Sequence, residues 1–235
     1  MKLNYLETRY DLSRRPKSEY PDKLIQYLMN RFSLRKGMKI LEVGSGRGEF
    51  LYAFQKQGLI CSGVDIDSTA KSFYEGIDIS ILDVTKEKFP FADNSFDVVY
   101  HKSVIEHMYS PEHMMIETHR ILKPGGKLIV LTPDWSSQMH VFYEDITHCR
   151  PYNITALTEA FEMFEFQPIT VEVFRQLPNL WYNKLVLMLA KLLTLMYGTR
   201  TGRWLGKFTG VKFLRFAVEL MILGVATKKS GITKK

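Results

Sequence analysis

The sequence predicts an α/β fold in which helices pack against a mostly parallel sheet. Short apolar runs of strand length alternate with amphipathic segments of helix length along most of the chain. Three of these runs stop abruptly at Gly44, Asp65 or Asp83, as strands do where a connecting loop begins. Hydrophobic residues make up 46% and charged residues 24% of the 235 residues, which is an ordinary balance for one globular domain.

The first part of the chain establishes the alternation. Residues 20–33 carry Leu and Ile at helical spacing behind Pro21, and therefore indicate a helix. The run KILEV at 39–43 predicts a buried strand, and 49–57 predicts a helix that Gly58 ends. Further strands are expected at 60–64, 77–82, 96–100 and 127–132, and a further helix at 112–122. Helical crossovers between successive strands favour a parallel sheet.

The second part of the chain continues with less regular spacing. The Lys-Pro-Gly-Gly sequence at 123–126 predicts a sharp turn, and 134–152 reads as a polar loop. Asn153 is placed to cap a helix that ends at Met163. The remaining expected elements are a strand at 166–174, an apolar helix at 180–197, a basic connector at 198–216 and a last strand at 218–226.

Glycines and carboxylates gather where the predicted strands end. Right-handed crossovers bring the carboxyl ends of parallel strands to one edge of a sheet, where ligands bind. Gly44, Gly46 and Gly48 occupy alternate positions there, so the backbone can turn tightly into a helix and approach a ligand closely. Asp65 ends the second strand and suits the two hydroxyls of a ribose. Asp83 ends the third strand and could accept a hydrogen bond from an adenine amino group.

Two further carboxylates separate this turn from a dinucleotide-binding turn. Glu49 stands where the pattern G-x-G-x-x-G requires its third small residue. Glu42 lies inside an otherwise apolar strand, so its burial calls for a cationic ligand group or backbone amides as partners. Both residues disfavour a nucleotide-dependent oxidoreductase of the nicotinamide type, which is the alternative for such a fold.

Five successive motifs cover roughly residues 36–133 and read ILEVGSGRGEF, GVDID, LDV, FPFADNSFDVVYHKSVIEHM and HRILKPGGKLIVLTP. In this order they resemble the motifs of class I S-adenosylmethionine-dependent methyltransferases with a type 11/23-like methyltransferase domain. The resemblance implies a Rossmann-like three-layer sandwich with a seven-stranded, mostly parallel sheet and a final antiparallel strand. It implies S-adenosyl-L-methionine as the cofactor.

The same resemblance implies which residues bind that cofactor. The implied set is Glu42, Gly44, Ser45, Gly46 and Gly48 at the methionine end, Asp65 and Ile66 at the ribose, Asp83 and Val84 at the adenine, and His101 beside the cofactor. Ser45 is a mild departure, because Cys or Thr is also common there. Methyl transfer from a sulfonium is an in-line displacement that depends mostly on positioning, and it needs a base only where the nucleophile must lose a proton.

Candidate residues for the acceptor side follow the fifth strand. Asp145 and His148 lie three residues apart in YEDITHCRPY, and a His–carboxylate pair is a suitable general base for an alcohol. The alternative is that His148 only satisfies a loop carbonyl. His107 is a further candidate at the end of the fourth strand, whereas its neighbour Glu106 could equally cap or orient backbone. No cluster of His, Cys and Asp has metal-binding spacing, so we expect no metal site.

A second resemblance concerns the acceptor. The stretches THCRPYN and LTEAFEMFEF are similar to a methyltransferase subgroup associated with surface polysaccharide or lipid-linked sugar assembly. Glu165 differs, since Gly usually ends this helix. This resemblance implies O-methylation of a sugar hydroxyl or carboxyl in a small-molecule, glycan or lipid-linked acceptor. The alternative outside enzymes is a cofactor-binding scaffold, against which the intact glycines and Asp65 argue.

Charge is unevenly distributed within the net +7 of the chain. Residues 175–235 carry twelve Lys and Arg against a single acidic residue, Glu219, whereas residues 1–174 carry twenty basic and twenty-four acidic residues. We therefore expect one methyltransferase domain over 1–235, with a helical, basic insertion at 175–216 before the last strand. Such a surface suits a negative partner, although a solvated basic face is the plain alternative.

The expected insertion combines apolar and basic residues. The helix at 180–197 is too short and too often charged to span a membrane, but its broad apolar face suits a membrane interface. Trp204 and Phe208 among basic residues suit an anionic membrane surface contacted through 180–216. A lid or dimer contact is the alternative, and nucleic acid is the least favoured partner.

The cysteines and the first residues of the chain indicate the cellular compartment of the protein. Cys61 and Cys149 form neither a disulfide framework nor a metal motif, which favours a reducing cytosol. Residues 1–11 contain no apolar run of the kind found in a secretory signal. We expect a cytoplasmic protein, peripheral at the inner face of the membrane.

Overall fold

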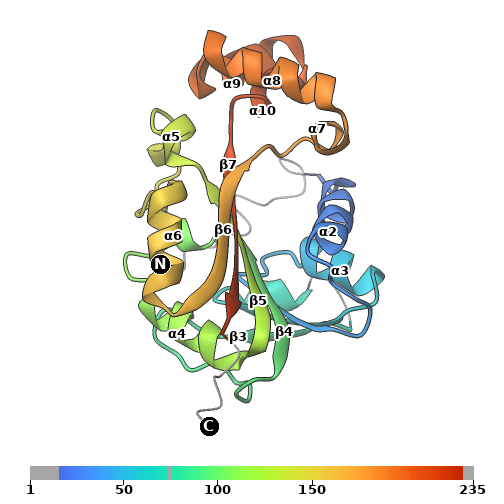
Figure 1. The fold of residues 1–235 in the computed structure, drawn as a ribbon, viewed down its shortest axis with the longest axis vertical. Coiled ribbons are helices and arrows are strands. Elements are labelled where there is room, and N and C mark those ends of the chain that lie inside the picture. The colour runs from blue at the N-terminus through green and yellow to red at the C-terminus, as the bar shows by residue number, and fades with distance from the viewer. Residues whose placement is uncertain (1–15, 73–75, 230–235) are drawn as a thin grey trace.

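The computed structural model describes residues 16–72 and 76–229, so the segment 1–11 lies outside the described residues. Seven strands form one sheet in the order β3-β2-β1-β4-β5-β7-β6, with β7 antiparallel to both of its neighbours (Figure 1). The strands are β1 (Lys39–Val43), β2 (Ile60–Asp65), β3 (Asp78–Ile81), β4 (Phe96–Lys102), β5 (Leu122–Pro133), β6 (Phe166–Phe174) and β7 (Met221–Lys228). The α/β class and the antiparallel final strand are thus confirmed.

Helices cover both faces of the sheet and complete three layers. The helices and short 3-10 turns of this sandwich are α2 (Tyr20–Arg31), α3 (Glu49–Lys56), η1 (Ser68–Ser72), η2 (Ile105–His107), α4 (Glu112–Ile121), α5 (Trp135–Gln138), η3 (Phe142–Glu144) and α6 (Ile154–Met163). The side chains of β4 contribute to two separate cores, because neighbouring residues of a strand point to opposite faces and the register shifts between Phe96 and Val98. Val98 and Tyr100 pack with α2 and α3, whereas Phe96 and Val99 pack with α4 and α6.

The segment around α6 follows the sequence prediction in part. Asn153 Oδ1 accepts a hydrogen bond from the Ala156 N–H at 2.8 Å, which confirms the predicted cap. The stretch 134–152, expected to be a polar loop, contains α5 and η3, and Phe142 within it is 2% exposed. This stretch is therefore packed structure over the sheet edge.

The Lys-Pro-Gly-Gly segment, predicted to form a sharp turn, lies within β5. Leu122 pairs with Phe96, and pairing resumes between Lys127 and Val98. The segment 123–126 is therefore a bulge inside β5, which starts directly where α4 ends.

Four helices lie between β6 and β7. They are α7 (Pro178–Tyr182), α8 (Lys184–Met196), α9 (Thr199–Thr209) and α10 (Lys212–Phe216). The single helix expected at 180–197 is divided at Asn183, whose extended backbone ends α7 and whose Oδ1 accepts from the N–H groups of Leu185 and Val186 at 3.1 Å. The stretch 198–216, expected to be a connector, is helical, and none of the described helices is long and apolar enough to cross a membrane.

Candidate active site

The glycine-rich turn joins β1 to α3. Gly44, Gly46 and Gly48 have φ angles of 68°, 51° and 69°, in the left-handed region that other residues rarely adopt. A Cβ atom on Gly44 would lie 2.5 Å from Cγ2 of Val104, which follows β4. The turn therefore needs glycine both for its conformation and for its close contact with the β4 loop.

Asp65 ties the end of β2 to this turn. Its Oδ2 accepts from the Gly46 N–H at 2.6 Å, and its Oδ1 accepts from the Asp67 N–H at 2.8 Å. Burial raises the pKa of this carboxyl, and the backbone hydrogen bonds oppose that shift. Ile66, the next residue, is 70% exposed. The hydroxyl-binding role of Asp65 and the ribose contact of Ile66 stay predictions.

Glu42 is a buried carboxyl with an unsatisfied oxygen. The residue is 2% exposed, and its Oε2 has no hydrogen-bond partner among the described residues. Burial, followed by the charge of Asp65, raises its pKa well above the usual range. Other buried polar atoms without a partner in the described part of the chain include Tyr20 Oη, Ser45 Oγ and Tyr100 Oη, which lie near Glu42 or the glycine turn.

The buried polar atoms without partners indicate whether the cofactor fits this site. Glu42 pairs across the sheet with Tyr100, and Phe50 lies between the rings of Tyr20 and Tyr100, at centroid distances of 6.3 and 6.1 Å. Buried polar groups without partners are rare in native proteins and call for a ligand or ordered water. S-adenosylmethionine offers an ammonium, a carboxylate and two hydroxyls, so its polar end fits this set of donors and acceptors.

The predicted adenine contacts are placed with their own partners. Asp83 Oδ1 accepts from both the backbone N–H and the hydroxyl of Thr85, at 3.0 and 2.6 Å. Its Oδ2 lies 3.0 Å from Lys86 Nζ, while Val84 packs partly buried against the core. An adenine amino group would have to share the Asp83 carboxylate with these donors, and this role stays a prediction.

His101 in β4 is fully buried and neutral. Neither ring nitrogen has a hydrogen-bond partner within the described residues, and burial lowers its pKa to about 3. Its position beside the cofactor stays a prediction. A neutral imidazole can only donate from one nitrogen and accept at the other.

Glu106, His107 and His148 converge beyond the end of β4. One ligating atom from each lies within 4.8 Å of the others, and the two imidazole centroids are 4.8 Å apart. The sequence spacing gave no sign of this convergence, because His148 comes from the segment after η3. The three residues have the chemistry of a metal-binding or acid–base cluster, and the expectation of no metal site stays a prediction.

Hydrogen bonds fix the tautomers of both histidines. His107 Nδ1 lies 2.9 Å from Thr147 Oγ1, whose hydroxyl donates to Asp145 Oδ1 at 2.6 Å. His148 Nδ1 lies 2.7 Å from the Phe142 carbonyl oxygen, which can only accept. Both Nδ1 atoms therefore carry the proton of the neutral ring, and Nε2 carries the lone pair. His148 does satisfy a loop carbonyl, and its Nε2 is 4.0 Å from Asp145 Oδ2.

Glu106 is a functional candidate to which the sequence assigned no chemical role. It is fully buried, its Oε2 accepts from the Thr132 hydroxyl at 2.8 Å, and its main-chain oxygen accepts from Cys149 N–H at 2.9 Å. Burial raises the pKa of this carboxyl to about 7. The available signal was a glutamate next to Ile105 and His107, in the short segment that follows a buried strand.

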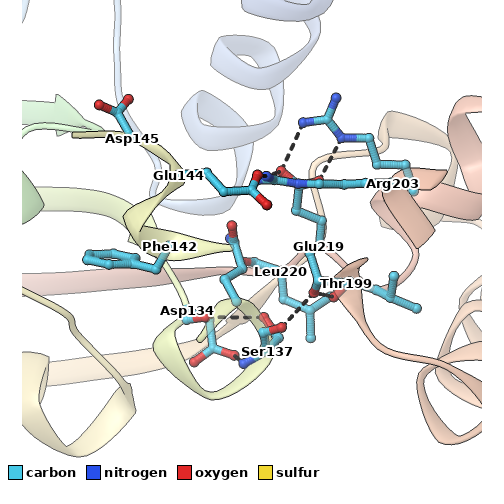
Figure 2. Close-up of polar contacts among 12 residues, drawn as sticks. Asp134, Ser137, Phe142, Glu144, Asp145, Thr199, Arg203, Glu219 and Leu220 are labelled. Carbon is cyan, nitrogen blue, oxygen red and sulfur yellow. Dashed lines mark hydrogen bonds and ion pairs between the residues drawn. The ribbon is translucent and has the colours of Figure 1, made fainter. Parts of the chain in front are cut away.

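Ion pairs and hydrogen bonds connect the helical insertion to η3 and α5 (Figure 2). Arg203 of α9 contacts Glu144 at 2.5 Å and Glu219 at 3.0 Å, so it links η3 to the residues just before β7. The Thr199 hydroxyl donates to the Ser137 carbonyl oxygen at 2.6 Å. The segment that carries Asp145 is therefore braced by α9.

A sheet of this strand order, with a glycine turn after β1 and an acidic residue at the end of β2, defines a class I S-adenosylmethionine-dependent methyltransferase. Residues 13–171 match the family described as a methyltransferase domain, of type 23. The chain belongs to this family, which confirms the predicted class and its cofactor.

Relatives of known name act on different atoms. The chain is 30% identical over 114 residues to the C-methyltransferase UbiE of ubiquinone and menaquinone biosynthesis from Bordetella avium, which is 45% of this chain and 44% of that protein. It is 25% identical over 203 residues to the ubiquinone biosynthesis O-methyltransferase of Nitrosococcus oceani, covering 83% and 82% of the two chains. The chain thus spans less than half of the length of the first relative.

A solved structure shares the fold. Phosphoethanolamine N-methyltransferase 2 of Haemonchus contortus, in complex with phosphomonomethylethanolamine and S-adenosylhomocysteine, matches with a TM-score of 0.60 and 19% identity. The match covers 88% of this chain and 52% of that one. At this identity the likeness concerns the fold.

Proposed function

We propose that this protein transfers a methyl group from S-adenosyl-L-methionine to an oxygen of a small-molecule, glycan or lipid-linked acceptor. The supporting observation is the contact between the two halves of the site. Gly44 of the glycine turn lies against Val104, which is only two residues from Glu106 and three from His107. The methyl donor and the acid–base cluster would then share one edge of the sheet.

The bound cofactor supplies a methyl group that its sulfonium already activates. The residues of the chain have to bind the acceptor, exclude water and receive the proton that a hydroxyl loses as its oxygen is methylated. His107 is oriented for this task, because Asp145 holds the Thr147 hydroxyl and Thr147 accepts from His107 Nδ1. The lone pair of Nε2 can take the proton.

His148 is the second candidate base. Its Nδ1–H is held by the Phe142 carbonyl, and a proton taken up at Nε2 would be stabilised by Asp145 at 4.0 Å. An oxygen acceptor is favoured over an amine, because a hydroxyl needs a base during transfer whereas a neutral amine already offers its lone pair. The Glu106 carboxylate lies close enough to stabilise the positive charge of either imidazole once that ring is protonated.

The proposed location is the cytoplasm, at the inner face of the membrane. Cys61 and Cys149 are both free thiols, as is usual in a reducing compartment. A lipid-linked acceptor would be reached at that face.

The test is incubation of the purified chain with S-adenosylmethionine labelled in its methyl group, with hydroxyl, carboxyl and amine acceptors and with cell extracts. We expect release of S-adenosylhomocysteine and a labelled O-methyl product, identified by mass spectrometry. Cofactor binding without a product from any acceptor class would favour the scaffold alternative. Calorimetry that finds tight NAD binding and no response to S-adenosylhomocysteine would favour the oxidoreductase.

A further inference from the structure

One face of α8 exposes a continuous apolar stripe. Its residues recur at helical spacing and are between 49% and 84% exposed: Leu185, Met188, Leu189, Leu192, Leu195 and Met196. The opposite side of the same helix packs into a small core around Ala190, which is fully buried with Leu180 and Ala217 beside it. Folding therefore uses one apolar side of α8 and leaves a second apolar side in water, which is unusual for a surface helix.

Aromatic side chains on α9 add to the exposed apolar surface. Trp204 and Phe208 are 61% and 78% exposed, and their rings stack with centroids 5.5 Å apart and an interplanar angle of 6°. Val211, between α9 and α10, is 47% exposed. Large exposed aromatic residues of this kind are typical of surfaces that enter the boundary between lipid headgroups and acyl chains.

Basic residues accompany this apolar surface. Lys184, Lys191, Arg200, Lys207 and Lys212 are exposed. Residues 175–218 contain no Asp or Glu at all, so the segment has no acidic side chain of its own. Arg203 and Arg215 are already paired with Glu219, and the exposed cations are additional to them. The surface is thus apolar and cationic together.

The insertion sits at the end of the sheet where the site lies. Met221, the first residue of β7, pairs with Phe174 at the end of β6 and with Pro133 at the end of β5. The segment 175–220 therefore leaves and re-enters the sheet at its carboxyl edge, and α8, α9 and α10 form a cap beyond that end (Figure 1). Arg203 and Thr199 fix this cap to η3 and α5.

We propose that the exposed faces of α8 and α9 dock in the plane of an anionic lipid bilayer and hold the acceptor site at the level of the headgroups. The inference deepens the proposed function, on which its statement about the acceptor rests. Apolar burial and attraction of lysines to anionic headgroups act together in such a helix. A second copy of the chain would bring like charges face to face, and nucleic acid would leave the apolar stripe in water.

The experiment is co-sedimentation of the full chain with vesicles of phosphatidylcholine alone or mixed with phosphatidylglycerol, without cofactor or acceptor. We expect at least about tenfold stronger binding to the anionic vesicles, weakened by salt through screening of the lysines. Leu195→Glu combined with Trp204→Glu should abolish binding, and Lys191→Glu combined with Lys207→Glu should remove the preference for anionic lipid. The matched control is Ile116→Glu, since Ile116 on α4 is 56% exposed but lies outside the cap.

Equal sedimentation with and without vesicles would overturn the docking proposal, as would unchanged binding by the Leu195 and Trp204 variant. A dimer that this variant dissociates, or binding to oligonucleotides in place of vesicles, would also overturn it. Calorimetry with S-adenosylhomocysteine tests whether each variant is folded. We expect every variant to bind it with the same affinity as the original chain. Methyl transfer without vesicle binding would contradict the docking proposal and support the proposed function. Vesicle binding without any methyl transfer would support docking and contradict the proposed function.

Discussion

The Gly46 N–H donates to Asp65 Oδ2 at 2.6 Å, which joins the turn after β1 to the end of β2. The same carboxylate also accepts from the Asp67 N–H at 2.8 Å. Asp65 thus both shapes the glycine turn and lies where the family resemblance implies the ribose. If the implied ribose contact is made, the same carboxylate would determine both cofactor affinity and the geometry of the turn.

Replacement of Asp65 by Ala should lower affinity for S-adenosylhomocysteine by at least about tenfold, because charged hydrogen bonds contribute roughly 1.5–3 kcal/mol each. Isothermal titration calorimetry measures the change. Asp78→Ala is the control, since Asp78 is an exposed carboxylate at the start of β3. Equal affinity in the Asp65 variant and the control would remove Asp65 from the cofactor site.

The Gly44→Ala variant tests the close approach of the turn to the β4 loop. The new Cβ would lie 2.5 Å from Val104 Cγ2, at a φ of 68° that is itself unfavourable for Ala. We expect a lower melting temperature and a loss of cofactor binding. The double variant Gly44→Ala with Val104→Ala should recover part of the stability, because it removes the clash but not the backbone cost. No recovery would show that backbone strain alone is responsible.

The alternation of strands and helices was predictable because the residues that determine each element lie within that element or directly beside it. Asn153 caps α6 through the next residues of the same chain, and the KILEV run becomes β1 with the predicted bounds. The sequence predicted a helical, basic insertion at 175–216 but described 198–216 only as a basic connector, whereas the structure forms α9 and α10 there. A Cβ on Gly206 would lie 2.9 Å from the Arg215 Cβ, so this glycine permits close packing of α9 on α10.

The acid–base cluster was only partly predictable. His107 and His148 were each recognisable as candidates, but their convergence with Glu106 depends on how the segment after η3 folds back over β4. Main-chain hydrogen bonds from Cys149 and Arg150 to the Glu106 oxygen, at 2.9 and 3.1 Å, make that return. No spacing along the chain encodes such a tertiary contact.

Replacement of His148 should separate catalysis from packing. His148→Ala is expected to lower turnover at least about tenfold with unchanged cofactor affinity, a lower bound beneath the roughly 10²–10⁴-fold effect of a general base. His148→Asn keeps an N–H that can donate to the Phe142 carbonyl, so it should fold normally and still lose turnover. The exposed His140→Ala is the control. Full activity of both His148 variants would leave this residue with a structural role.

The buried Glu106 carboxyl should make stability depend on pH. Its pKa is raised by burial from 4.5 to about 7, so the folded state keeps a proton that the unfolded chain releases. Its stabilising contribution is complete below about pH 4.5 and is lost as the pH rises through about 7. The difference in unfolding free energy between the original chain and Glu106→Gln should change by roughly 3 kcal/mol across this window. Denaturation by urea at several pH values measures it, and a difference independent of pH would contradict the burial of a protonated carboxyl.

Glu219 should be the more sensitive end of the ion-pair cluster that braces α9. It is 8% exposed and accepts from Arg203 and Arg215, whose hydrogen bonds outweigh burial and hold its pKa below the usual range. Glu219→Gln removes the buried charge that Arg203 and Arg215 share, so Arg203 keeps only its exposed partner Glu144. Breaking a buried pair costs roughly 3–5 kcal/mol. Glu144→Gln removes a partner that is 58% exposed, so it should cost about 0–1 kcal/mol. Equal unfolding free energies for the two variants would show that the cap is held by its apolar contacts, since the cluster would then add nothing beyond a surface ion pair.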